Sequence, residues 1–271
     1  MAARGGEAAG RQEAGARMSR QMENAQKLYL RGIRDGAVDE VLSTYMGKTY
    51  TQHSTGVKDG KAGFAEFFQD FFRRNPKRGI EIVRAFEDGP FVFLQVYQNL
   101  NDGAAQWVTA DIFRADAEGR IVGHWDVIEA YEAPKTGESD QVKGSFAVDR
   151  SQSGDASKAV VRRFLVEEFQ NRNAEAFGEF VAEDVIQHDA RIGQGRASWR
   201  KYAEVHDVSY DFVFKVVGES NWVAACSKAD IDGVECALFD IFRIEDGRIA
   251  EHWDVAEPVP PRAELANSGK F

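Results

Sequence analysis

The chain has few of the residues on which several common protein classes depend. Cysteine occurs only twice among 271 residues, as Cys226 and Cys236, and no Cys-x-x-Cys motif is present. The sequence therefore supports neither a disulfide-stapled secreted fold nor a cysteine-based zinc site. No run of 18 consecutive apolar residues occurs, so no segment is predicted to span a bilayer. These features favour a cytoplasmic protein.

Basic residues are in the minority. The sequence has 34 Lys and Arg against 44 Asp and Glu, which gives a formal net charge of -10. Such a surface repels phosphate backbones and anionic lipids, so neither nucleic acid nor a membrane is an expected partner. Glycine-rich phosphate loops, His-Glu-x-x-His motifs and serine nucleophile elbows are also missing. We therefore expect no cofactor.

What the sequence does contain is an internal repeat. Residues 111–127 include Asp-Ile-Phe-Arg followed by Gly-Arg-Ile-Val-Gly-His-Trp-Asp-Val, and residues 240–255 repeat both blocks with few changes. Upstream, a Gln-His pair at 52–53 recurs at 187–188. Separated blocks that recur in the same order indicate a duplication. Four of the five histidines occupy equivalent positions in the two copies, namely His53, His124, His188 and His252.

The duplication divides the chain into two domains of ordinary size. The stretch between them is rich in glycine, serine and charge, and three prolines within four residues precede the C-terminal segment. We predict a disordered tail over 1–18, a first domain over 19–135, a linker over 136–155, a second domain over 156–260 and a C-terminal tail over 261–271.

Each copy is predicted to place its helices before its strands. In the first copy the segments 24–34, 38–45 and 60–74 have helical patterns, and the third carries five phenylalanines at helical spacing between Phe64 and Phe72. Four strands follow, at 80–86, 91–99, 105–114 and 120–130, separated by short turns. This order predicts an α+β class in which helices cover one face of a curved antiparallel sheet and leave a cone.

The second copy repeats this order with one difference. It is about six residues shorter across the third helix and the hairpin that follows, and the shortened helix contains Trp199 and Tyr202. The two pockets are therefore not expected to be equivalent.

The motifs resemble the SnoaL-like branch of the NTF2-like superfamily. The resemblance rests on Gln-His after a short strand, the Phe-rich helix and the final Asp-Ile-Phe-Arg to His-Trp-Asp-Val hairpin, and it covers nearly all of both halves. It implies two tandem NTF2-like cone domains. Family members are similar to polyketide cyclases, dehydratases and isomerases, whereas other members of the superfamily are non-enzymatic binders and transport factors. Fold alone therefore does not decide the function.

The repeated His-x-Asp pairs are the candidate catalytic residues. Residues two apart in a strand point to the same face, so His124 and Asp126 emerge together, as do His252 and Asp254. A carboxylate can remove a proton next to a carbonyl while a neighbouring donor stabilises the enolate. The resemblance implies this chemistry, because SnoaL-like cyclases use an acid/base Asp late in the sheet. A simpler interpretation makes the Trp between each pair a core anchor with two hydrogen-bonded polar neighbours.

A metal site is a weaker interpretation of the same residues. His53, His124 and Asp126 have the residue types of a two-His-one-carboxylate site, and His188, His252 and Asp254 form a second such set. Their spacing is not diagnostic, so we predict no metal.

Five further residues are candidates for substrate binding. His53 and His188 are placed either at the pocket mouth or where they fix a corner of the fold. Gln95 and Tyr97, on a strand in the middle of the sheet, could donate hydrogen bonds to a carbonyl. Because the second copy has Cys226 and Lys228 there, these residues favour the first copy as the working one. Trp199 is the fifth candidate.

The sequence thus predicts a cofactor-independent lyase, isomerase or cyclase that acts on a small apolar carbonyl compound by aldol-type or dehydration-type acid/base chemistry. Two alternatives remain open. One is a module that binds an apolar ligand without reacting, and the other is an interaction protein that uses the outer faces of its sheets. NTF2-like domains commonly pair through their sheets, so two linked copies could form a pseudo-dimer within one chain. The whole protein would then be a monomer or a homodimer.

Overall fold

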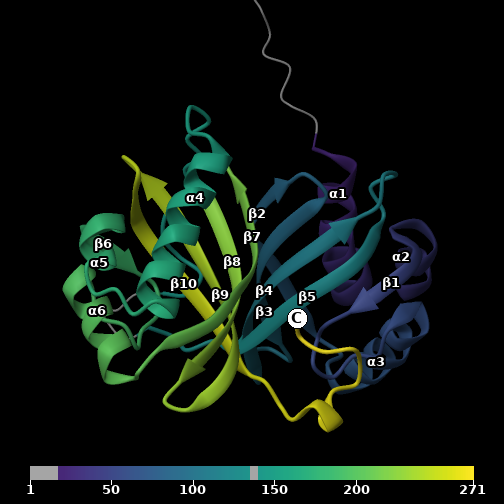
Figure 1. Ribbon diagram of the computed structural model, residues 1–271. Coiled ribbons are helices and arrows are strands. Elements are labelled where there is room, and N and C mark those ends of the chain that lie inside the picture. Colours follow the sequence, from purple (N-terminus) through teal and green to yellow (C-terminus); the bar gives the residue numbers. More distant parts are fainter. Residues whose placement is uncertain (1–17, 135–139) are drawn as a thin grey trace, which may run out of the picture.

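The computed structural model describes residues 18–134 and 140–271. Within these ranges the chain forms two α+β units, each with helices on one side of a five-stranded sheet (Figure 1). The α+β class predicted for both copies is confirmed. Nearly all of the tail predicted over 1–18, and the first part of the predicted linker, lie outside the described residues. No helix in the described part of the chain is long and apolar enough to cross a membrane.

The first domain has the three predicted helical segments and the four predicted strands in order, but a further strand, β1 (Met46–Gln52), lies between the second and third helical segments. Its strands run in the order β1-β5-β4-β3-β2, with β2 to β5 as an antiparallel meander. Strand β1 pairs with β5 in parallel orientation, so the sheet is mixed rather than purely antiparallel. The elements are α1 (Arg20–Lys27), the π-helical η1 (Leu28–Arg34), α2 (Val38–Thr44), β1 (Met46–Gln52), α3 (Gly60–Arg74), β2 (Arg78–Asp88), β3 (Phe91–Leu100), β4 (Ala105–Ala115) and β5 (Ile121–Ala130).

The second domain repeats this topology, with strand order β6-β10-β9-β8-β7. Its third helix has 10 residues where α3 has 15, as the shortened sequence predicts. The elements are α4 (Gly154–Leu165), η2 (Val166–Gln170), α5 (Ala176–Phe180), β6 (Val181–Gln187), α6 (Arg196–Val205), β7 (Ser209–Glu219), β8 (Trp222–Ile231), β9 (Val234–Glu245), β10 (Arg248–Pro258) and η3 (Arg262–Glu264).

The two faces of each sheet belong to different cores. On β3, Val92, Leu94 and Val96 pack beneath the helices of the first domain. Phe93, between them, packs in a third core that includes Trp253 of the second domain. This alternation follows from the two-residue period of a strand. The sheets therefore lie back to back in the middle of the molecule, with the helices outside (Figure 1).

Candidate functional site

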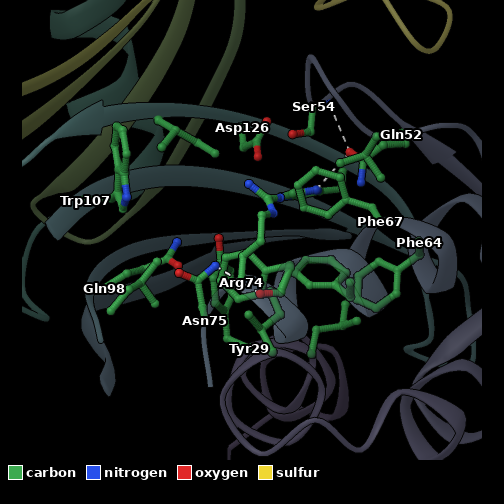
Figure 2. A pocket seen from close by; sticks show the side chains of 18 of the residues that line it. Tyr29, Gln52, Ser54, Phe64, Phe67, Arg74, Asn75, Gln98, Trp107 and Asp126 are labelled. Carbon is green, nitrogen blue, oxygen red and sulfur yellow. Dashed lines mark hydrogen bonds between the residues drawn. The ribbon is translucent and has the colours of Figure 1, made fainter. Parts of the chain in front are cut away.

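The helices and sheet of the first domain enclose a cavity of about 420 Å³ (Figure 2). Four phenylalanines of α3, together with aliphatic side chains from η1 and the strands, form most of its wall. Apolar cavities with a few polar groups are typical small-molecule sites. The polar and charged side chains that reach this cavity are Tyr29, Tyr50, Gln52, Ser54, Arg74, Asn75, Gln98, His124 and Asp126.

His124, on β5, is held between two fixed partners. Its Nδ1 lies 3.0 Å from Oε1 of Gln52, and its Nε2 lies 2.7 Å from Oδ1 of Asp111 on β4. The same Gln52 oxygen accepts from the backbone N–H groups of His53 and Ser54, which fixes the orientation of the amide. Nδ1 of His124 therefore donates to Gln52. Neither ring nitrogen is free to contact a substrate.

Asp111 is fully buried, and both of its carboxylate oxygens already have hydrogen-bond partners in the protein. Besides contacting His124, it accepts from the hydroxyl groups of Tyr29 and Thr109, each at 2.7 Å. Burial, followed by the charge of Asp111, raises the pKa of Tyr29 well above its usual value. Tyr29 thus stays protonated as a donor. The arrangement ties the first helical segment to the sheet.

Asp126 differs from Asp111 because its side chain accepts no hydrogen bond from the described residues. It is 6% exposed and projects from β5 into the cavity (Figure 2). Its one ion-pair partner in the described chain is Lys270, whose Nζ lies 3.6 Å from Oδ1. A carboxylate with lone pairs available in a largely apolar cavity is suited to proton abstraction.

Arg74 enters the same space from the end of α3 (Figure 2). Its guanidinium forms no ion pair with any described residue, whereas Arg73 beside it pairs with Asp70 outside the cavity. The cavity thus combines a buried carboxylate with an exposed cation at its entrance.

Tyr50, on β1, supplies a further polar group that was not predicted as a site residue. Its oxygen accepts from Nε2 of Gln52 at 3.2 Å, and no described residue accepts its hydroxyl proton. Burial, and then the charges of Asp126 and Asp111, raise its pKa well above the usual value, so it remains a neutral donor. The sequence did hold a signal, because Val185 replaces Tyr50 in the second copy.

The equivalent space in the second domain is almost filled. Its cavity measures about 20 Å³. Trp199 takes the place of Phe64 and stacks on His252 with ring centroids 4.1 Å apart. His252 nevertheless keeps its partners, Gln187 at 2.8 Å and Asp240 at 3.0 Å. Since the hydrogen-bonded triad persists without a pocket, its histidine acts as a structural anchor there.

Asp254, the counterpart of Asp126, also has different surroundings. Arg191 lies 3.8 Å from its Oδ1, and Asp189 stands where the first copy has Ser54. Burial, and then the charge of Asp189, raise the pKa of Asp254 well above its usual value. The protonated form is therefore favoured, in a space with no room for a substrate.

The predicted placement of Gln95 and Tyr97 in the pocket is wrong. Both side chains lie on the opposite face of β3, where Gln95 accepts from Arg84 at 2.6 Å and the Tyr97 hydroxyl donates to Gln106. The cavity-facing residue nearest to them is Gln98. Because β3 has apolar residues on both faces, its pattern does not show which face meets the helices.

His53 and His188 do not reach the cavities either. His53 stacks on Trp125 at 4.7 Å, and its Nδ1 donates to the carbonyl of Gly269. His188 stacks on Trp253 at 4.3 Å. Burial lowers the pKa of His53, which favours its neutral form. Of the two predicted alternatives for these histidines, only the fixing of a corner agrees with these contacts.

These positions also decide the metal interpretation. Since His53 faces away, the set of His53, His124 and Asp126 does not converge. Ligand atoms of Asp111, His124 and Asp126 do lie within 4.8 Å of one another. However, the ring nitrogens of His124 and the oxygens of Asp111 already have partners in the protein. These residues fit a hydrogen-bond network better than a metal site.

The fold defines an α+β protein built from two copies of one cone-shaped domain, and the first copy encloses a cavity of about 420 Å³. A family model described as the SnoaL-like domain matches residues 26–124 and again residues 161–252. The chain belongs to this SnoaL-like family and carries two tandem copies of its domain.

Solved structures with a similar fold align with parts of the chain. A provisionally assigned ketosteroid isomerase from Kribbella flavida is 18% identical, with 42% of this chain and 90% of that one covered and a TM-score of 0.36. The provisionally assigned polyketide cyclase IdmH from Streptomyces antibioticus is 22% identical, with 37% and 91% covered and a TM-score of 0.31. An NTF2-like protein of unknown function from Cytophaga hutchinsonii is 18% identical, with 38% and 90% covered and a TM-score of 0.34. No curated protein sequence matches the chain significantly.

Proposed function

We propose that the first domain is a cofactor-independent acid/base enzyme of the lyase, isomerase or cyclase type that acts on a small, largely apolar carbonyl compound. The observation that supports this proposal is the buried carboxylate of Asp126, without hydrogen-bond donors, in a cavity of about 420 Å³. In this proposal the second domain is a structural partner, since its own cavity is about 20 Å³.

Asp126 is the proposed base. It removes a proton from the carbon next to the substrate carbonyl, while the hydroxyl of Tyr50 donates a hydrogen bond to the carbonyl oxygen as negative charge develops there. The electron pair of the broken C–H bond becomes the enolate. In an isomerisation, protonated Asp126 returns the proton to another carbon. In an aldol cyclisation, the enolate attacks a second carbonyl of the same compound, and protonated Asp126 returns the proton to the alkoxide that forms.

His124 has a positioning role in this proposal rather than the acid/base role considered from the sequence. Its ring holds Oε1 of Gln52, and Nε2 of Gln52 in turn donates to the Tyr50 oxygen. The chain of contacts orients the Tyr50 hydroxyl. His252 and Asp254 are not proposed to react, because Trp199 occupies the space that a substrate would need.

The proposal is tested by hydrogen–deuterium exchange at α-carbons, detected by NMR in a panel of β-keto and hydroxycarbonyl compounds. We expect wild-type protein to exchange the α-proton of at least one compound and the Asp126→Asn variant to lose that exchange. A folded variant with unchanged exchange would contradict the role of Asp126. Saturable binding with no exchange in any compound would instead support a module that binds a ligand without reacting.

A further inference from the structure

The end of the chain crosses from the second domain to the first and lies against the wall of its cavity. The backbone N–H of Ala266 donates to the carbonyl of Thr55, and the side-chain amide of Asn267 donates to the carbonyls of Ser54 and Val57 at 2.5 and 2.8 Å. Ser54 and Val57 both line the cavity. This C-terminal segment, 266–271, therefore supports the cavity wall and does not simply follow the surface.

The segment contains a buried lysine, Lys270. The side chain of Lys270 is 1% exposed, and its Nζ donates to the main-chain carbonyl of Asp126 at 2.8 Å and to Oε2 of Glu257 at 3.0 Å. Strand β1 ends at Gln52, opposite His124, so the edge of β5 beyond this point lacks a neighbouring strand. Lys270 and Glu257 occupy that edge, and Glu257 also accepts from the backbone N–H of Ile128 at 3.2 Å.

In the second domain, the equivalent histidine contacts the linker instead of the C-terminal segment. The carbonyl of Asp140 in the linker accepts from His188, just as the carbonyl of Gly269 accepts from His53. The cation beside Asp254, however, is Arg191, which belongs to the domain's own loop after β6. Among the ion pairs of the described residues, the aspartate of the first domain, Asp126, pairs with a lysine from the second half of the chain. Asp254 of the second domain pairs with an arginine of its own domain.

We infer that Lys270 is a positioning residue for Asp126: its ammonium holds the carboxylate in the charged, proton-accepting form, so the C-terminus of the second copy completes the site of the first. The inference rests on the proposed function of Asp126 as a base. An opposite charge within about 4 to 6 Å favours the ionised form of a carboxylate, and burial on the cavity wall disfavours it. Lys270 thus offsets the cost of keeping a charge where a base is needed.

Several other ionisable groups face Asp126 and set the background for this effect. Asp111 lies directly opposite on β4, and its Oδ1 lies 2.7 Å from Nε2 of His124. Removal of Lys270 would leave Asp126 and Glu257 without their shared cation. The groups around Asp126 are Tyr29 of η1, Tyr50 of β1, Arg74 of α3, Asp111 of β4, His124 of β5 and Glu257 of β10.

The test follows the Asp126 carboxyl itself by ¹³C NMR of aspartate-labelled full-length protein, with its signal assigned from its loss in Asp126→Asn. We expect the titration midpoint of this signal to lie about one to three pH units higher in Lys270→Met than in wild type. Lys270→Arg, which keeps a cation, should restore most of the difference. Lys201→Gln, which removes an exposed lysine of α6, should leave the midpoint unchanged.

An unchanged midpoint in Lys270→Met would overturn the inference. An equally raised midpoint in Lys270→Arg and Lys270→Met would also overturn it, because the cause would then be a displaced C-terminal segment rather than a lost charge. The measurement needs no substrate. A raised midpoint in a protein that exchanges no α-protons would therefore refute the proposed enzyme function while supporting the role of Lys270.

Discussion

Trp199 stacks on His252 with ring centroids 4.1 Å apart, at the position where the first domain has Phe64 and an open cavity. Both domains retain the buried Gln-His-Asp network, but only one retains space for a ligand. The first cavity measures about 420 Å³, whereas the equivalent space in the second domain measures about 20 Å³.

Replacing Phe64 by Trp should close the first cavity. The larger ring would occupy space next to His124, as Trp199 does next to His252, so binding of a neutral apolar probe should weaken at least about tenfold. Overpacking should cost about 1–3 kcal/mol of the free energy of unfolding. Titration of the fluorescent probe Nile red, alongside denaturant unfolding, checks both effects. Trp199→Phe is the matched control, and unchanged probe binding in Phe64→Trp would contradict the assignment of the cavity.

Removing the Tyr50 hydroxyl should slow the proposed reaction. Loss of a hydrogen-bond donor to a developing oxyanion typically lowers kcat by about 10²–10³. Tyr50→Phe should cost only about 1 kcal/mol of stability, because Gln52 loses one neutral partner. Tyr45→Phe serves as the control, since the hydroxyl of Tyr45 donates to Glu40 outside the cavity. Equal exchange rates for the two variants would contradict an oxyanion role for Tyr50.

Arg74 should select substrates with an anionic group at the cavity entrance. An unpaired guanidinium beside an apolar space favours carboxylates over their esters. Arg74→Gln should therefore weaken binding of an aryl β-keto carboxylate about tenfold and leave binding of its methyl ester unchanged. The control Arg73→Gln removes a neighbouring charge that pairs with Asp70. Equal losses for acid and ester in Arg74→Gln would show that the residue acts on cavity shape rather than on charge.

Stability at low pH should depend on Glu251. Although burial acts to raise its pKa, hydrogen bonds from His188 and Arg243 lower the pKa of Glu251 to about 2. A carboxylate with a lowered folded-state pKa stabilises the fold above its unfolded value, near 4.5, and this contribution is lost as the pH falls from there towards 2. The loss should reach up to about 3 kcal/mol.

Denaturant unfolding of wild type and Glu251→Gln between pH 2 and pH 7 tests this expectation. The variant should be less stable at pH 7, and the difference should shrink as the pH approaches 2. A difference that is constant over this range would show that the carboxylate charge is not the cause.

The sequence alone predicted the duplication, the order of the helices and of the last four strands, and the shared face of His124 and Asp126. Repeats and two-residue strand periods are local properties of a chain. Gln95 and Tyr97 were predicted on the wrong face of β3. This strand carries apolar residues on both faces, so its sequence does not show which face meets the helices. Lys270 was not foreseen because it meets a residue 144 positions away through a segment without regular pattern.

The filling of the second cavity was also beyond the sequence. A sequence pattern treats tryptophan and phenylalanine on a helix face alike, as apolar core residues. Only the packing shows that the Trp199 ring stacks on His252. The availability of the Tyr50 hydroxyl as a donor depends on which of its neighbours are already paired. Such pairing is a property of the folded network and not of the residue type.

In the proposed function, the chemistry takes place in the first cavity and depends on Asp126. The most direct test is the α-proton exchange rate of one active compound with Asp126→Asn and Asp254→Asn, two equivalent substitutions in the two copies. We expect exchange to be lost in Asp126→Asn and retained in Asp254→Asn, with both variants folded. Retained exchange in Asp126→Asn, or equal loss in both variants, would show that Asp126 is not the base.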